Sequence, residues 1–124
     1  MAKNILIVED SVDLQDLLSQ HFEAEGYEPS RAYNGKQALE FLRTTPILPS
    51  LILLDIMMPV MDGIEFRQAQ LKDPRLATIP VVVMTADTNY EAKMKQLHTA
   101  ELIRKPISNV TKLFEVVEKH RRAD

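Results

Sequence analysis

Four short, continuous runs of aliphatic residues constrain the fold of this chain more than any other feature. They are Ile5–Val8, Leu51–Leu54, Val81–Met84 and the shorter Leu102–Ile103. Runs that are apolar at every position, rather than alternating with polar residues, are typical of strands covered on both faces, as in a parallel sheet. A fifth strand is expected around Tyr27–Tyr33, where residues 28–30 interrupt the apolar pattern.

Segments with helical spacing fill the intervals between these runs. Leu14, Leu17, Leu18 and Phe22 share one helix face, and Gly26 follows as a helix-ending residue. Further helix starts are expected at Asn34, at Asp62 with Glu65, at Thr88 with Glu91, and after Ser108. A strand followed by a helix, repeated five times, predicts right-handed crossovers and an α/β fold, a three-layer α/β/α sandwich around a five-stranded parallel sheet. We expect one domain over residues 1–124.

Composition excludes several classes of protein. The 124 residues contain no cysteine, which removes disulfide scaffolds, cysteine-based metal sites and thiol nucleophiles. No apolar run approaches the roughly 20 residues of a membrane span, and no signal sequence is visible at the N-terminus, so a cytoplasmic protein without membrane insertion is expected. The net charge of −3 argues against direct nucleic-acid binding, and three scattered glycines form no phosphate-binding loop.

Polar residues follow the expected strands where a parallel α/β sheet binds its ligands. The first expected strand ends in Glu9 and Asp10, the third in Asp55, the fourth in Thr85 and the fifth in Lys105. Taken singly, each has an ordinary explanation, such as a helix cap at Asp10 or a solvated strand end at Asp55. Together, three carboxylates at one edge indicate a hard cation, with Mg²⁺ the usual choice. A carboxylate beside Mg²⁺ can attack phosphorus, while an ammonium and a hydroxyl contact the oxygens of the transferred group.

These residues belong to longer motifs that occur in a fixed order. They are Ile5-Leu6-Ile7-Val8-Glu9-Asp10, Asp55-Ile56-Met57-Met58-Pro59-Val60-Met61-Asp62-Gly63, Ile79-Pro80-Val81-Val82-Val83-Met84-Thr85-Ala86 and Lys105-Pro106. With these motifs the chain resembles, over nearly its whole length, the receiver domain of two-component response regulators. The resemblance implies a flavodoxin-like, doubly wound (βα)5 fold.

The same resemblance implies a role for each site residue. Asp55 becomes the phosphoacceptor of a phosphorelay, and Glu9, Asp10 and Asp55 become ligands of Mg²⁺ together with the Met57 backbone carbonyl. Thr85 becomes the switch hydroxyl and Lys105 the ion-pairing lysine, followed by a cis peptide bond to Pro106. A histidine kinase or a histidine phosphotransfer protein would donate the phosphoryl group. The protein would then be a signalling switch rather than an enzyme, and it would act on a downstream protein partner, because the receiver pattern occupies the chain almost from end to end.

The sequence departs from the family pattern at two places. Leu102 stands where the family usually has Tyr or Phe, an aromatic residue that changes orientation on phosphorylation. The stretch between Thr85 and Lys105 is about two residues shorter than usual and lacks a Gly-Ala pair after Leu97-His98-Thr99. Asp87, two residues after Thr85, is expected beside the path of the hydrolytic water. Two alternatives therefore stay open: an interaction module that does not use phosphorylation, and a phosphohydrolase with Asp55 as nucleophile. The second is disfavoured by Met57, where such enzymes carry another Asp.

Overall fold

The fold is built on one parallel sheet of five strands. The structure is a computed structural model that describes residues 3–86 and 97–122. The strands run in the spatial order β2-β1-β3-β4-β5, with each neighbouring pair parallel, so the expected doubly wound α/β fold is confirmed. Their bounds are β1 Lys3–Val8, β2 Tyr27–Ala32, β3 Leu51–Asp55, β4 Val81–Thr85 and β5 Glu101–Arg104.

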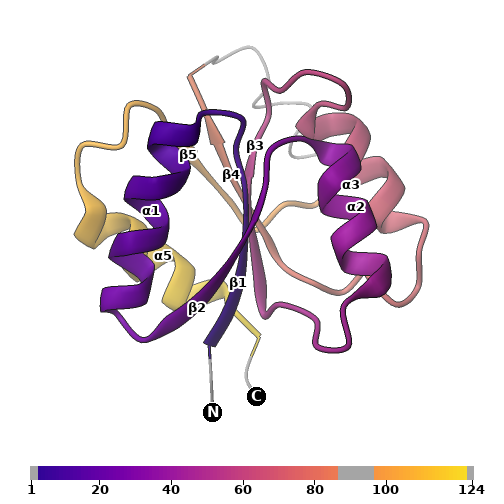
Figure 1. Ribbon diagram of the computed structural model, residues 1–124, viewed down its shortest axis with the longest axis horizontal. Helices are drawn as coiled ribbons and strands as arrows, with labels where there is room; N and C mark the ends of the chain where they lie inside the picture. Colours follow the sequence, from indigo (N-terminus) through magenta and orange to yellow (C-terminus); the bar gives the residue numbers. More distant parts are fainter. Residues whose placement is uncertain (1–2, 87–96, 123–124) are drawn as a thin grey trace.

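Helices cover both faces of this sheet. Figure 1 shows α1 and α5 on one face and α2 and α3 on the other, which confirms the three-layer sandwich. The helix expected from Thr88 and Glu91, and the residue Asp87, lie outside the described residues. The bounds are α1 Val12–Ala24, α2 Gly35–Thr44, α3 Gly63–Leu71 and α5 Val110–His120.

Several helices begin at the capping residues that the sequence predicts. The Asn34 side chain accepts a hydrogen bond from the backbone N–H of Gln37 (2.9 Å) and so caps α2. Asp62 and Glu65 form the expected reciprocal capping box at the start of α3. Gly26 follows α1 with φ +87°, a left-handed conformation that favours glycine. The last helix is capped by Asn109, one residue beyond the serine that precedes the helical pattern.

The continuous apolar runs are explained by cores on both faces of the sheet. Alternate residues of one strand enter different cores: Leu51 and Leu53 pack with α1 and α5, while Ile52 and Leu54 pack with α2 and α3. Every residue of β3 and β4 is buried. Both faces therefore require apolar side chains, and the usual polar alternation disappears.

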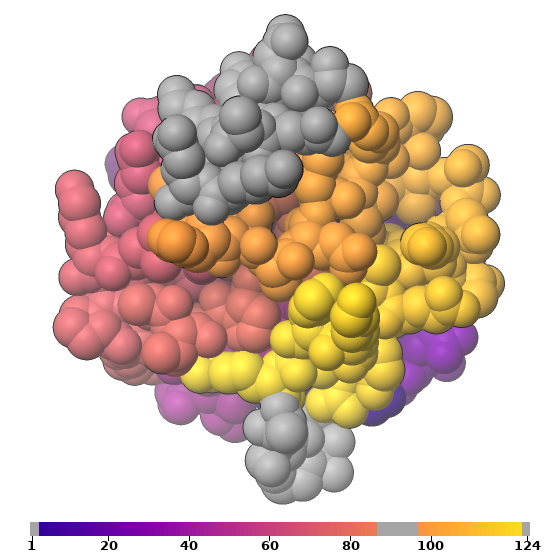
Figure 2. All heavy atoms as spheres, turned by 180° about the vertical axis from the view of Figure 1, so that it is seen from behind, coloured from indigo at the N-terminus to yellow at the C-terminus, as the bar shows by residue number. Residues whose placement is uncertain are grey.

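The edge strands β2 and β5 contain fewer apolar residues in sequence because less of each strand is buried. β2 has only its first and last residues, Tyr27 and Ala32, buried, and no residue of β5 is fully buried. Figure 2 shows the segment that includes β5 at the surface beside α5. A strand with one open side tolerates polar residues, which explains the interruption at 28–30.

The start of β1 and the end of α5 lie on the same side of the molecule (Figure 1). At the C-terminal end, the backbone N–H of Arg122 donates to the carbonyl oxygen of Ser50 (2.8 Å), immediately before β3 begins. This side is the one where the parallel strands start, opposite their carboxyl ends. Within the described residues, no helix has both the length and the apolar character needed to cross a membrane.

Candidate functional site

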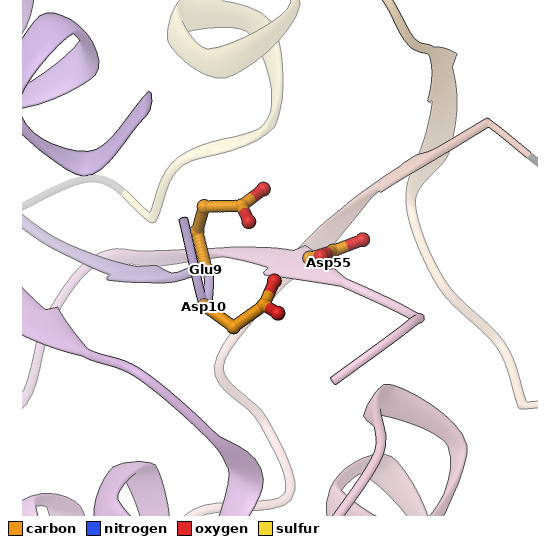
Figure 3. Close-up of side chains that lie close together, drawn as sticks. All are labelled: Glu9, Asp10 and Asp55. Carbon is orange, nitrogen blue, oxygen red and sulfur yellow. The ribbon is translucent and has the colours of Figure 1, made fainter. Parts of the chain in front are cut away.

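The carboxyl ends of three adjacent strands, β1, β3 and β4, bring four of the expected residues to one edge of the sheet. Glu9 and Asp10 follow β1, Asp55 is the last residue of β3, and Thr85 is the last residue of β4. Figure 3 shows the side chains of Glu9, Asp10 and Asp55 gathered in one region. One carboxylate oxygen from each lies within 4.8 Å of the others. The sequence-based expectation that these acids converge is therefore confirmed in geometry.

Lys105 supplies the positive charge that compensates this cluster. Its ammonium forms an ion pair with Glu9 Oε1 and lies 3.4 Å from Asp55 Oδ2. Glu9 is 1% exposed and Asp55 3% exposed, whereas Asp10 is exposed. The second oxygen of Glu9 accepts a hydrogen bond from the backbone N–H of Ser11 (3.0 Å). With all three acids ionised, one lysine against three carboxylates leaves the cluster short of positive charge.

The excess of negative charge, together with burial, changes the pKa of Asp55. Burial of its carboxyl group and the neighbouring Glu9 charge raise the pKa of Asp55 to about 7, although Lys105 and the Met57 N–H act in the opposite direction. Burial alone would lower the pKa of Lys105. Its hydrogen bond to Glu9 and the charge of Asp55 outweigh burial, so the pKa of Lys105 lies above its ordinary value. The lysine therefore stays charged at neutral pH, whereas the pKa of Asp55 lies close to neutral pH.

The donor set fits a hard divalent cation. All the convergent atoms are carboxylate oxygens, and no His or Cys belongs to the cluster. Two acids are buried and the third, Asp10, faces solvent, which leaves room for the waters that Mg²⁺ retains. A divalent ion would also relieve the repulsion that raises the Asp55 pKa.

The loop between β3 and α3 holds Asp55 in place. The backbone N–H of Met57 donates to Asp55 Oδ1 (3.3 Å), and the N–H of Gly63 donates to the carbonyl oxygen of Ile56 (2.9 Å). Gly63 lies so close that an added Cβ would stand 2.5 Å from the Asp55 carbonyl oxygen. Val60 adopts φ +70°, an unusual conformation for a β-branched residue, within a turn closed by the Met61 N–H and the Pro59 carbonyl. The Met57 carbonyl as a metal ligand stays a prediction.

Thr85 and Lys105 are joined through the backbone. The N–H of Lys105 donates to the Thr85 carbonyl oxygen (2.9 Å), and Thr85 is buried. The Lys105–Pro106 bond is cis, as the resemblance implied. Leu102 is partly buried against the core that contains α2 and α3. His98 has φ +54°, so a histidine occupies a left-handed position in the segment that precedes the missing Gly-Ala pair.

Four buried polar residues on helices were not found by sequence reasoning: Gln15 and Ser19 on α1, and Arg67 and Gln70 on α3. Gln15 on α1 and Arg67 on α3 are 0% and 4% exposed. The Arg67 guanidinium donates to the carbonyl oxygens of Leu97 and His98 (3.0 Å each) and to Gln70 Oε1 (2.7 Å), and burial lowers the pKa of Arg67. Arg67 thus ties α3 to the turn before β5. One sequence feature could have predicted such residues, namely a polar residue among the apolar positions of a helix, as Gln15 lies between Leu14 and Leu18.

Comparisons with known proteins agree with this architecture. The fold and the acidic edge define a flavodoxin-like α/β domain with a carboxylate cluster at the carboxyl end of its sheet. The family description "Response regulator receiver domain" matches residues 5–118, so the chain belongs to the response regulator receiver family of two-component signalling. This family generally acts as signalling switches rather than catalysts, binds Mg²⁺ at an acidic pocket, and interacts with histidine kinases and downstream partners.

Similar proteins include a curated relative and two solved structures. The chain is 35% identical over 122 residues to the polar-differentiation response regulator DivK of Brucella anthropi, covering 97% of each chain. It resembles the signal receiver domain of a signal transduction histidine kinase from Syntrophus aciditrophicus, with 32% identity, TM-score 0.84, and 99% and 96% of the two chains covered. It also resembles the response regulator TrrA of Thermotoga maritima in complex with Mg²⁺–BeF, with 30% identity, TM-score 0.83, and 94% and 97% covered.

Proposed function

We propose that this chain is a receiver domain over residues 1–124 that accepts a phosphoryl group on Asp55 in a Mg²⁺-dependent reaction. The observation that carries this proposal is the buried Asp55 carboxylate, which shares one edge with Glu9, Asp10 and the Lys105 ammonium. The similarity to TrrA, solved with Mg²⁺–BeF, supports the same kind of chemistry. The proposal places the protein in the cytoplasm, with a histidine kinase or a histidine phosphotransfer protein as donor.

The reaction follows from the positions of the side chains. A carboxylate oxygen of Asp55 attacks the phosphorus of the donor's phosphohistidine, forming an O–P bond as the P–N bond breaks, and the imidazole leaves with a proton from solvent. The Lys105 ammonium, 3.4 Å from Asp55 Oδ2, contacts the oxygens of the transferred group. The Thr85 hydroxyl, at the end of the neighbouring strand β4, would contact the same oxygens. Glu9, Asp10, Asp55 and the Met57 carbonyl would hold Mg²⁺, and the bound ion would supply positive charge to offset that of the incoming phosphate.

Protonation of Asp55 sets when the reaction is possible. Only the ionised carboxylate is a nucleophile, and in the metal-free protein the pKa of Asp55 is raised to about 7. A divalent ion beside Asp55 favours the ionised form. With a pKa of about 7, only about half of Asp55 is ionised at pH 7 without the metal, and a bound divalent ion would increase that ionised fraction.

Intact-mass spectrometry after incubation with Mg²⁺ and acetyl phosphate tests the proposal. We expect one added phosphoryl group, lost in Asp55→Asn, suppressed by EDTA and retained in the control Asp13→Asn, which changes an exposed acid in the first turn of α1. An unchanged mass with small phosphodonors and with a purified histidine kinase alike would overturn it. Phosphorylation that survives Asp55→Asn would place the modification elsewhere.

A second experiment tests the output. Phosphorylation adds negative charge and acceptor oxygens at the sheet edge, and we propose that this changes affinity for a downstream protein. A pulldown with phosphorylated protein and with Asp55→Ala should recover a partner preferentially in one of the two states. Equal recovery would favour the phosphorylation-independent interaction module instead.

A further inference from the structure

Gln15 is a fully buried polar residue in the first turns of α1. Its side-chain nitrogen donates to the carbonyl oxygens of Ile7 (2.7 Å) and Ala32 (2.8 Å), at the ends of β1 and β2. It also lies 3.3 Å from the carbonyl oxygen of Glu9. One helix side chain therefore holds the ends of two strands and the first residue beyond them.

The contact between Gln15 and the Glu9 carbonyl lies at the peptide group that joins the two acidic residues, Glu9 and Asp10. The Glu9 carbonyl belongs to the peptide group that joins Glu9 to Asp10, so its orientation sets the direction of both side chains. The same Ala32 carbonyl that accepts from Gln15 also accepts from the Glu9 backbone N–H (3.0 Å). Gln15 and Ala32 thus fix the peptide groups on both sides of Glu9.

The two polar ends of the Gln15 amide have different surroundings: the nitrogen donates to backbone carbonyl oxygens, and the oxygen does not accept a hydrogen bond among the described residues. This oxygen, Oε1, is buried, which makes the lack of a partner unfavourable. The other buried residues of α1 are the apolar Leu18 and Phe22 and the polar Ser19. An apolar residue at position 15 would leave no unpaired oxygen, but it would remove the donor from the carbonyl oxygens of Ile7 and Ala32. The amide nitrogen of Gln15 therefore makes the contacts that reach the acidic site.

We propose that Gln15 is a positioning residue that pre-orients Glu9 and Asp10 for Mg²⁺. This inference rests on the proposed function, because the acidic pair matters only if it holds the metal. Gln15 itself does not touch the metal or the phosphoryl group. It acts through the Glu9–Asp10 peptide, and its loss weakens metal binding before it affects phosphoryl transfer.

The test compares Gln15→Met with a matched control. Methionine keeps the length and the apolar stem but removes the donor. Ser19→Ala removes the other buried polar group of α1, a hydroxyl without a hydrogen-bond partner among the described residues. Calorimetric Mg²⁺ titration should show about tenfold weaker binding for Gln15→Met and wild-type binding for Ser19→Ala. At saturating Mg²⁺, phosphorylation by acetyl phosphate should stay within about twofold of wild type.

A metal-free measurement separates this inference from the proposed function. The Ser11 amide donates to Glu9 Oε2, so hydrogen exchange at Ser11 should be faster in Gln15→Met than in Ser19→Ala. Faster exchange and weaker Mg²⁺ binding support the positioning role, even if wild type accepts no phosphate and the proposed function fails. Wild-type Mg²⁺ affinity in Gln15→Met, or equal weakening in both variants, overturns it. If Gln15→Met does not fold, Gln15→Asn, with an amide too short to reach all three carbonyls, should show an intermediate loss of Mg²⁺ affinity.

Discussion

Gly63 offers the sharpest test of how the β3–α3 loop positions Asp55. In Gly63→Ala, the new Cβ would stand 2.5 Å from the Asp55 carbonyl oxygen and 2.8 Å from Ile56 Cα. Ordinary contact begins at 3.4 Å, so the two backbone segments must separate by about 0.9 Å (3.4 − 2.5). Both contacts involve backbone atoms, so no side-chain rotation relieves them.

The cost can be estimated from this geometry. Overpacking of this kind typically costs about 1–3 kcal/mol, and the separation also weakens the hydrogen bond from Gly63 to Ile56, worth about 1 kcal/mol. The better helix propensity of alanine offsets less than about 1 kcal/mol. We expect Gly63→Ala to lose about 1–3 kcal/mol of stability, which lowers Tm by about 4–12 °C. Because Asp55 is displaced, phosphorylation by acetyl phosphate should slow by about 10- to 100-fold.

Gly26→Ala is the matched control. Gly26 has φ +87° but nothing within 4 Å of an added Cβ, so alanine there is strained only by its backbone conformation. We expect a loss of about 1–2 kcal/mol with no change in the rate of phosphorylation. Thermal melts and a phosphorylation time course on both variants decide the question. Wild-type stability and rate in Gly63→Ala, or an equal loss of rate in both variants, would refute the reasoning.

Three further predictions concern charges. Without Mg²⁺, the raised pKa of Asp55 (about 7, from 3.8) means that the folded state holds a proton the unfolded state has lost, so stability falls as pH rises from about 4 to 7. Above pH 7, the free energy of unfolding of Asp55→Asn should therefore be about 2–4 kcal/mol higher than that of wild type, as measured by denaturant titration. This difference should disappear below about pH 4 or in saturating Mg²⁺. Lys105→Met leaves Glu9 and Asp55 buried without a cation and should cost about 3 kcal/mol at pH 8, with Mg²⁺ restoring part of the loss; a wild-type melting curve would contradict this. Hydrogen bonding by Arg121 lowers the pKa of Glu118 to about 2, so this group stabilises the fold above pH 4.5 and stops doing so as pH falls to about 2. Because Glu118 is solvent-exposed, Glu118→Gln should lose about 1 kcal/mol or less at pH 7 and nothing near pH 2, as measured by melts at both pH values.

Much of the fold was predictable because local chemistry and global topology agree. The aliphatic runs mark strands that need apolar residues on both faces, and Asn34 and Asp62 cap helices as their sequence context indicates. The edge strands were harder, since β2 ends at Ala32, one residue before the expected Tyr33, and its middle is open to solvent. Burial at an edge depends on neighbours that a local pattern does not contain.

The site was predictable in composition but not in its internal contacts. The rule that ligands bind at the carboxyl ends of parallel strands was enough to group Glu9, Asp55 and Lys105. That Lys105 pairs with Glu9 as well as Asp55, and that Gln15 holds the Glu9 carbonyl, depends on side-chain rotamers and on how α1 docks against the sheet. Long-range contacts of this kind are not encoded in spacing along the chain.

The placement of the two ends has a practical consequence for experiments. Lys3 begins β1, and Arg122 hydrogen-bonds to Ser50 just before β3, so the first and last described residues lie on the side of the sheet opposite Asp55, which ends β3 (Figure 1). A tag, biotin handle or fused fluorescent protein at either end would therefore face away from the carboxylates. Immobilised through such a handle, the domain would present its acidic edge to the solution. Surface-based binding assays with a kinase could then use either orientation of the fusion.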